Sequence, residues 1–179
     1  METNIKTTLI EIKLNDNLIS SIGAIAIAIA KALETNSKLS TLDIGYNSIG
    51  SIGAIAIAEA LKTNTTLSTL VMRNNNIGSD GATAIAKALE TNSKLSTLDI
   101  GYNSIGSIGA TAIANALKTN TTLSTLVLSK NRIGDDGTEA IAEALEINKI
   151  LTEIKLDGNL IYDEIKTKIL DKEKRIIFN

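Results

Sequence analysis

The sequence predicts a right-handed α/β solenoid, with parallel strands on a concave face and helices on a convex face. Three observations predict it. An apolar motif returns every 28 residues, apolar residues alternate within that motif, and an alanine-rich segment of helical spacing follows it. One such unit cannot bury its own apolar side, so neighbouring units must stack. Stacked strands lie about 4.8 Å apart and packed helices about 8–10 Å apart, so the stack curves with the strands inside.

The recurring motif has the form L-x-x-L-x-L-x-x-N and occurs six times. In the copy at 39–47, Leu42 and Ile44 alternate with small or polar residues, which indicates a strand with one buried face. Only 2% of the 179 residues are aromatic and 44% are hydrophobic, so we expect one domain with an aliphatic core. We divide it into units at about 8–35, 36–63, 64–91, 92–119, 120–147 and 148–162, followed by a C-terminal capping helix at about 163–179.

The second half of each unit predicts a helix. Ala54, Ile57 and Leu61 stand at helical spacing, and Gly50 marks the turn that leads into this segment. The expected N-cap residues are polar and precede each alanine-rich run: Ser51, Ser79, Ser107 and Asp135.

An asparagine closes each copy of the motif. A buried amide can satisfy backbone groups of its own turn and of the adjacent unit, so we expect a structural ladder and no catalytic role. Its members are Asn17, Asn47, Asn75, Asn103, Asn131 and Asn159.

These motifs resemble the leucine-rich-repeat family. The pattern L-x-x-L-x-L-x-x-N-x-I-G followed by G-A-x-A-I-A-x-A-L is similar to its ribonuclease-inhibitor-like class, which includes Ran GTPase-activating proteins and the sensor arrays of NOD-like receptors. The resemblance covers about residues 8–161 and implies protein binding through the concave face or its edges. Ran-activating members are longer and carry an acidic tail that is absent here, so we do not carry that activity over.

The candidate partner-binding site lies among the concave positions of the middle strands. Tyrosine and arginine are enriched at binding hot spots, and this region gathers them with two aspartates. The site residues are Asp43, Tyr46, Arg73, Asp99 and Tyr102. The alternative is that the tyrosines are ordinary surface residues, duplicated when residues 35–90 were copied into 91–146.

The composition argues against catalysis. The chain contains no His and no Cys, so it lacks the commonest general base, metal ligand and thiol nucleophile. Asp43 and Asp99 stand two units apart on an open sheet, where no deep pocket is expected. We therefore predict a non-enzymatic protein with no catalytic residues, no cofactor and no metal site. With 18 basic and 20 acidic residues, it offers no electrostatic case for nucleic acid or an anionic membrane.

The first unit departs from the others and suggests a homodimer. Its helical segment is two residues longer and carries Ile25, Ile27 and Ile29 where we expect water-facing side chains. An exposed patch of this kind can pair with a second copy. The alternative is that the extra turn shields its own unit.

We accordingly expect a protein–protein interaction module whose partner the sequence does not identify. A self-associating structural array is the alternative, and a regulator of a small GTPase a weaker one. The lack of Cys suits a reducing compartment, and residues 1–14 lack the features of a signal peptide. We expect a cytoplasmic protein, or an effector delivered into a host cytosol. The charged tail is read as a cap, with a secretion or partner signal as the alternative.

Overall fold

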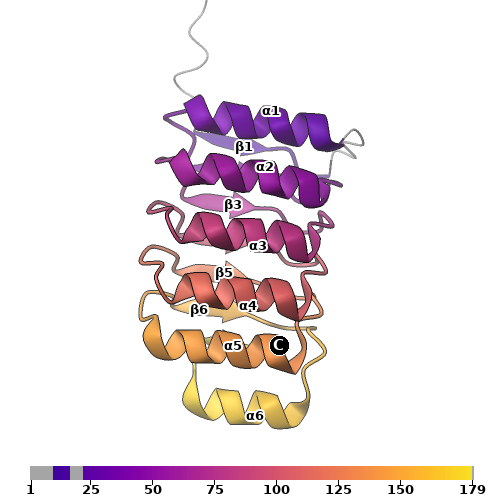
Figure 1. The fold of residues 1–179 in the computed structure, drawn as a ribbon, viewed down its shortest axis with the longest axis vertical. Helices are drawn as coiled ribbons and strands as arrows, with labels where there is room; N and C mark the ends of the chain where they lie inside the picture. Colours follow the sequence, from indigo (N-terminus) through magenta and orange to yellow (C-terminus); the bar gives the residue numbers. More distant parts are fainter. Residues whose placement is uncertain (1–9, 17–21, 179) are drawn as a thin grey trace, which may run out of the picture.

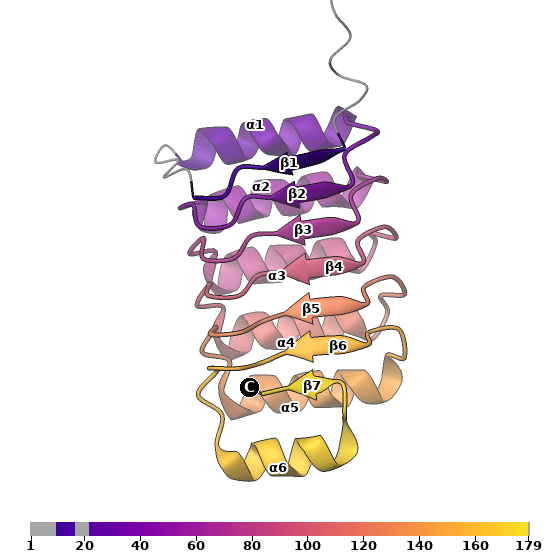
Figure 2. The ribbon, with the colours of Figure 1, turned by 180° about the vertical axis from the view of Figure 1, so that it is seen from behind.

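The computed structural model describes residues 10–16 and 22–178, without the side chains of 22–25, 171 and 172. Within these residues the strands form one parallel sheet in chain order (Figure 2). They are β1 Glu11–Lys13, β2 Thr41–Asp43, β3 Thr69–Val71, β4 Thr97–Asp99, β5 Thr125–Val127, β6 Glu153–Lys155 and β7 Ile176–Ile177.

The helices form a second layer that covers one side of this sheet (Figure 1). They are α1 Ile22–Thr35, α2 Gly50–Thr63, α3 Gly78–Leu89, α4 Gly106–Leu117, α5 Gly134–Ile147 and α6 Asp163–Lys172. This arrangement confirms the predicted α/β solenoid of parallel strands and stacked helices. We call the uncovered side of the sheet the strand face and the opposite surface the helix face.

The core lies between the two layers and repeats from unit to unit. Leu42 pairs in register with Leu70, and both are fully buried together with helix residues such as Ile57 and Ile85. Small residues allow the helices to approach closely. A Cβ atom built on Gly109 would lie 2.9 Å from the Cβ of Ala82 in the preceding helix. The apolar period of the sequence therefore sets both the core and the spacing of the helices.

The helix starts differ from the expectation. Ser51 lies inside α2, the N-cap position is Ile49, and no side chain of the described residues caps this helix. The same holds for α3, α4 and α5. The reason is the turn before each helix, where Gly50 adopts φ 66° and donates its N–H to the carbonyl of Asn75 in the next unit. Hydrogen bonds between units take the place of the predicted side-chain N-caps.

Buried asparagines form a ladder at the strand-to-helix turns. Asn103 shows the pattern: its Nδ2 donates to the carbonyls of Met72 and Ile100, and its Oδ1 accepts from the backbone N–H of Asn75. The members in the described part of the chain are Asn47, Asn75, Asn103, Asn131 and Asn159. Asn17 lies outside the described residues. Each amide thus ties its own turn to neighbouring units.

A second asparagine ladder, which we did not predict, runs along the helix-to-strand turns. Asn92, just after α3, donates from Nδ2 to the carbonyl of Leu61 in α2 and accepts at Oδ1 from the N–H groups of Lys94 and Leu95. Equivalent positions hold Asn36, Asn64, Asn120 and Asn148. The signal was present in the sequence, since an asparagine follows each helical segment at the period of the repeat.

The C-terminal end is closed by a helix, a strand and an arginine. The helix expected over about 163–179 ends at Lys172, and the chain then returns as β7, which pairs with β6. Arg175 donates from Nη1 to the carbonyl of Asn148 and from Nη2 to that of Leu145. In inner units an asparagine of the next unit takes these carbonyls, so Arg175 replaces the missing rung of the second ladder.

Candidate partner-binding surface

The predicted site residues lie on the strand face, in and just after the central strands. Asp43 and Asp99 occupy the same register position on β2 and β4, with Val71 of β3 between them. Their side chains are partly exposed, as the alternating pattern requires. Tyr46 and Tyr102 lie in the turns that follow β2 and β4, and the structure brings both close to Arg73.

Arg73 lies between the two tyrosine rings. Its Cζ atom is 4.4 Å from the ring centroid of Tyr102 and 6.0 Å from that of Tyr46. Lys130 extends the arrangement, with its Nζ atom 4.9 Å from the ring centroid of Tyr102. Cations near the face of an aromatic ring are attracted by the electrons of the ring. We call these four side chains, Tyr46, Arg73, Tyr102 and Lys130, the aromatic–cation row.

Lys130 was not among the predicted site residues. It occupies the position that Tyr102 holds in the preceding unit, so the period of the repeat was enough to place it in the same column. What the sequence could not show is that its side chain turns toward the ring. That depends on rotamers across three units.

The turns that carry the row have a left-handed backbone. Tyr46, Tyr102 and Lys130 adopt φ values of 53°, 59° and 53°, which is uncommon for residues other than glycine. Asn74, at the same position of another unit, also has φ 53°. The conformation is therefore a property of the repeated turn. It does not mark the tyrosines alone, but it does fix the direction in which they leave the sheet.

The two aspartates are bonded to their own turns. Asp43 Oδ1 accepts from the N–H of Gly45 at 3.0 Å, and Asp99 Oδ1 accepts from the N–H of Gly101 at 2.9 Å. Burial raises the pKa of the Asp99 carboxyl, although the Gly101 N–H and the charge of Arg73 oppose the shift. Each aspartate thus shapes the turn that positions the neighbouring tyrosine.

Tyr102 and the cations beside it shift one another's pKa. Lys130 first, and then Arg73, lower the pKa of the Tyr102 hydroxyl, and Tyr102 in turn raises the pKa of Lys130. Arg73 Nε is buried and has no hydrogen-bond acceptor among the described residues. Contacts with the rings therefore contribute to holding the guanidinium. The result is an ordered, amphipathic surface that crosses four consecutive units.

Of the isoleucines predicted to form one exposed patch, the two whose side chains are described do not share a face. Ile29 aligns with the fully buried Ile57 and packs against the core, so its predicted exposure is wrong. Ile27 points outward and is 40% exposed. The side chain of Ile25 lies outside the described residues. The prediction placed the two extra residues of this unit inside its helix, and that is wrong. Helices α1 and α2 both have 14 residues, so the extra residues lie between β1 and α1 and Ile29 takes the position of Ile57.

Comparison with known families decides the classification. A family profile described as Leucine Rich repeat matches residues 35–58, 63–86, 91–114 and 119–142, which is more than half of the chain. The chain belongs to the leucine-rich-repeat family. The predicted resemblance is thereby confirmed at the level of the family.

Two solved structures share the fold of this leucine-rich-repeat chain. One is titled "Leiomodin-1 Actin-Binding Site 2 (ABS2)", with 25% identity and a TM-score of 0.66 over 92% of this chain and 87% of that one. The other is a tropomodulin C-terminal domain from Caenorhabditis elegans, with 16% identity and a TM-score of 0.65 over 93% and 92%. At 16% identity the second likeness concerns the fold alone. No curated protein matches the chain in sequence.

Two properties of the described residues concern membranes and metals. No helix among them is long and apolar enough to cross a membrane. No three or more of their Asp, Glu, His or Cys side chains are grouped so that they could hold a metal ion.

Proposed function

We propose that this leucine-rich-repeat chain is a non-catalytic protein-interaction module. It binds a protein partner through the strand face, around Asp43, Tyr46, Arg73, Asp99 and Tyr102. The observation that carries the proposal is the position of Arg73 between two tyrosine rings. Tyrosine and arginine are enriched at hot spots, and side chains that are already ordered lose less entropy on binding.

The neighbouring structures suggest which partner to test first. The leiomodin-1 structure is named for an actin-binding site, and this chain is 25% identical to it over most of both lengths. Actin is therefore the first defined protein to test, beside partners captured from the native cell. The lack of Cys suits a reducing compartment, and we propose that the module works in a cytosol, its own or that of a host.

The test is affinity capture followed by binding measurements with actin and with each captured protein. The variant Tyr46→Ala/Tyr102→Ala should lose the partner about tenfold or more, because it removes both rings that hold Arg73. Tyr162→Ala is the matched control, since Tyr162 is exposed and lies outside the strand face. A partner that binds the double variant as well as the wild type, or an epitope confined to the helix face, would contradict the proposal.

A second candidate, self-association through the N-terminal unit, has its own observation. Among the described strands β1 pairs with β2 alone, and a small pocket of about 60 Å³ opens there between Ile12, Leu14 and Ile29. Ile10, next to β1, and Ile27, on the outer surface of α1, are both exposed. Under a two-fold axis through Ile12, Glu11 of one copy would face Lys13 of the other, which is a self-complementary pattern.

Solution mass over a concentration series tests this dimer. Ile10→Lys/Ile27→Lys should shift the chain toward monomer, whereas Ile108→Lys, on the exposed face of α4, should not. A wild type that stays monomeric throughout the series would eliminate the dimer. A role as a regulator of a small GTPase has no residue in the described part of the chain to carry it, so we do not propose it.

A further inference from the structure

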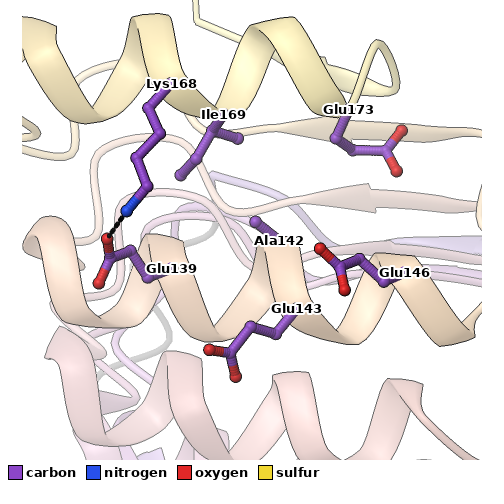
Figure 3. Close-up of a pocket in the computed structure, with 7 residues that line it drawn as sticks. All are labelled: Glu139, Ala142, Glu143, Glu146, Lys168, Ile169 and Glu173. Carbon is purple, nitrogen blue, oxygen red and sulfur yellow. Dashed lines mark hydrogen bonds and ion pairs between the residues drawn. The ribbon is translucent and has the colours of Figure 1, made fainter.

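The helix face contains a groove that the strand-face proposal does not use. It lies between α5 and α6 and has a volume of about 330 Å³ (Figure 3). Ala142 of α5 and Ile169 of α6 contribute apolar surface, and glutamates surround them. Ala142 is only partly buried, whereas its equivalents Ala86 and Ala114 are fully covered by the next helix. The groove exists because α6 covers less of α5 than the inner helices cover of one another.

Two of the glutamates at this groove are already neutralised. Lys168 of α6 reaches Glu139 of α5 at 2.9 Å (Figure 3), and Glu173 pairs with Arg175. Glu143 and Glu146 are exposed and form no ion pair with any other described residue. The groove therefore carries two negative charges without a partner in the described structure.

The pair Glu143 and Glu146 departs from the repeat. At these positions α2 has Glu59 and Lys62, which form an ion pair at 2.7 Å. The corresponding residues of α3 and α4 also include one lysine each, Lys87 and Lys118. In α5 the lysine is replaced, so two like charges stand three residues apart on one helix. Such a pair is locally destabilising, and a cation from outside would relieve the repulsion.

An exposed apolar residue lies beside these charges. Ile147 is four residues after Glu143, so the two share a helix face, and it is 61% exposed. The inner units have threonine at this position: Thr63, Thr91 and Thr119. The last full unit has thus exchanged a cation for an anion and a polar residue for an apolar one on the same surface.

We infer that the groove between α5 and α6 docks a basic amphipathic segment of a protein partner. Two lysine or arginine side chains of that segment, about one helical turn apart, would meet Glu143 and Glu146. Its apolar side would cover Ile147 and the apolar part of the groove. A single metal ion fits less well, since no three acidic side chains of the described residues are close enough to bind one. This site is independent of the strand-face proposal.

The test uses a fluorescent amphipathic helical peptide built of leucine and lysine, and its counterpart with glutamate in place of lysine. Fluorescence anisotropy should show binding of the lysine peptide and not of the glutamate peptide. Glu143→Gln/Glu146→Gln should weaken binding about tenfold, because it removes two ion pairs that together are worth up to about one factor of ten. Ile147→Thr, which restores the repeat residue, should weaken it about threefold.

The control is Glu34→Gln/Glu90→Gln, which removes two exposed charges of the same helix layer away from the groove. It should change the affinity less than twofold. Equal losses in both double variants would show that the peptide senses only net charge and would overturn the inference. So would undiminished binding by the Glu143→Gln/Glu146→Gln variant, or equal binding of the two peptides.

Discussion

At the scale of single residues, the two asparagine ladders stabilise the fold, whereas the aromatic–cation row orders side chains at the surface. The ladder amides are hydrogen-bonded and, apart from the partly exposed Asn36, buried, so their contribution is stability. The row is at the surface, where its rings and cations order one another without filling the core. Each group can be tested by a substitution that leaves the other unchanged.

The first prediction concerns a ladder residue. Asn103→Ala leaves the carbonyls of Met72 and Ile100 and the N–H of Asn75 without their amide partner. It should lower the free energy of unfolding by about 1–3 kcal/mol in urea melts. Asn115→Ala, on the exposed side of α4, is the control and should change it by less than about 0.5 kcal/mol. Equal effects of the two changes would contradict a structural role for the ladder.

The second prediction concerns the hydroxyl of Tyr102. Lys130 and Arg73 favour its ionised form, so its pKa lies below the usual value of about 10. Lys130 is the larger cause of this shift, so Lys130→Met should raise the pKa of Tyr102. Ultraviolet titration of the phenolate measures it in a Tyr46→Phe/Tyr162→Phe background, in which Tyr102 is the single tyrosine. An unchanged titration midpoint would show that Lys130 does not interact with Tyr102 in solution.

The same scale shows how far the sequence predicted the site. Tyr46, Arg73 and Tyr102 were placed on one surface because strand positions repeat with a fixed period, and the structure brings them within contact distance. The order of the side chains in the aromatic–cation row, and the inclusion of Lys130, depend on side-chain rotamers and on left-handed turns. The sequence pattern shows neither the rotamers nor the turns.

At the scale of the elements, the sequence predicted the strands and helices well because the same strand pattern and the same helix pattern recur in every unit. The exceptions are informative. Helix starts were misplaced by a residue or two, since glycine turns and bonds between units replaced the expected caps. The strand β7 was missed because two isoleucines after a charged helix carry no readable alternation. The pattern within a unit predicted its strand and helix, whereas contacts between units determined where the helices begin.

The third prediction concerns the distance between helices. Replacing glycine by alanine in a helix normally stabilises it by about 1 kcal/mol. At Gly109 the added Cβ would lie 2.9 Å from the Cβ of Ala82, so α3 and α4 would have to separate. Gly109→Ala should therefore destabilise the protein by about 1–3 kcal/mol. Thr111→Ala, an exposed change on the same helix, should be neutral or slightly stabilising in the same denaturation series.

At the scale of the whole molecule, the ends differ. The C-terminal end adds α6 and β7 and fills the second ladder with Arg175. At the other end, β1 has a neighbour on one side among the described strands. In a solenoid each unit is coupled mainly to its neighbours, so a defect at one end should loosen the units next to it first. The closed end is where this can be tested.

The fourth prediction concerns Arg175. Arg175→Met would remove the guanidinium donors to the carbonyls of Leu145, Asn148 and Leu151 and would leave Glu173 without its partner. Lys149 Nζ would still donate to the Leu145 carbonyl. It should destabilise the chain by about 1–3 kcal/mol, and hydrogen exchange should accelerate in β6 and α6 before it does in β3. Uniform acceleration along the chain would show that Arg175 stabilises the whole molecule rather than its end.

The same ion pair gives this end a dependence on pH. The guanidinium of Arg175 lowers the pKa of Glu173 below its ordinary value, so the folded state favours the ionised carboxylate. The contribution of the pair is complete above the unfolded-state pKa of about 4.3 and is lost as the pH falls through the lower folded-state pKa. Glu173→Gln should remove this part of the acid sensitivity, so that the protection factors of amides in β6 and α6, corrected for the intrinsic exchange rate at each pH, fall less between neutral and acidic pH than in the wild type. An identical fall of the protection factors in both proteins would mean that the pair does not couple pH to the closed end.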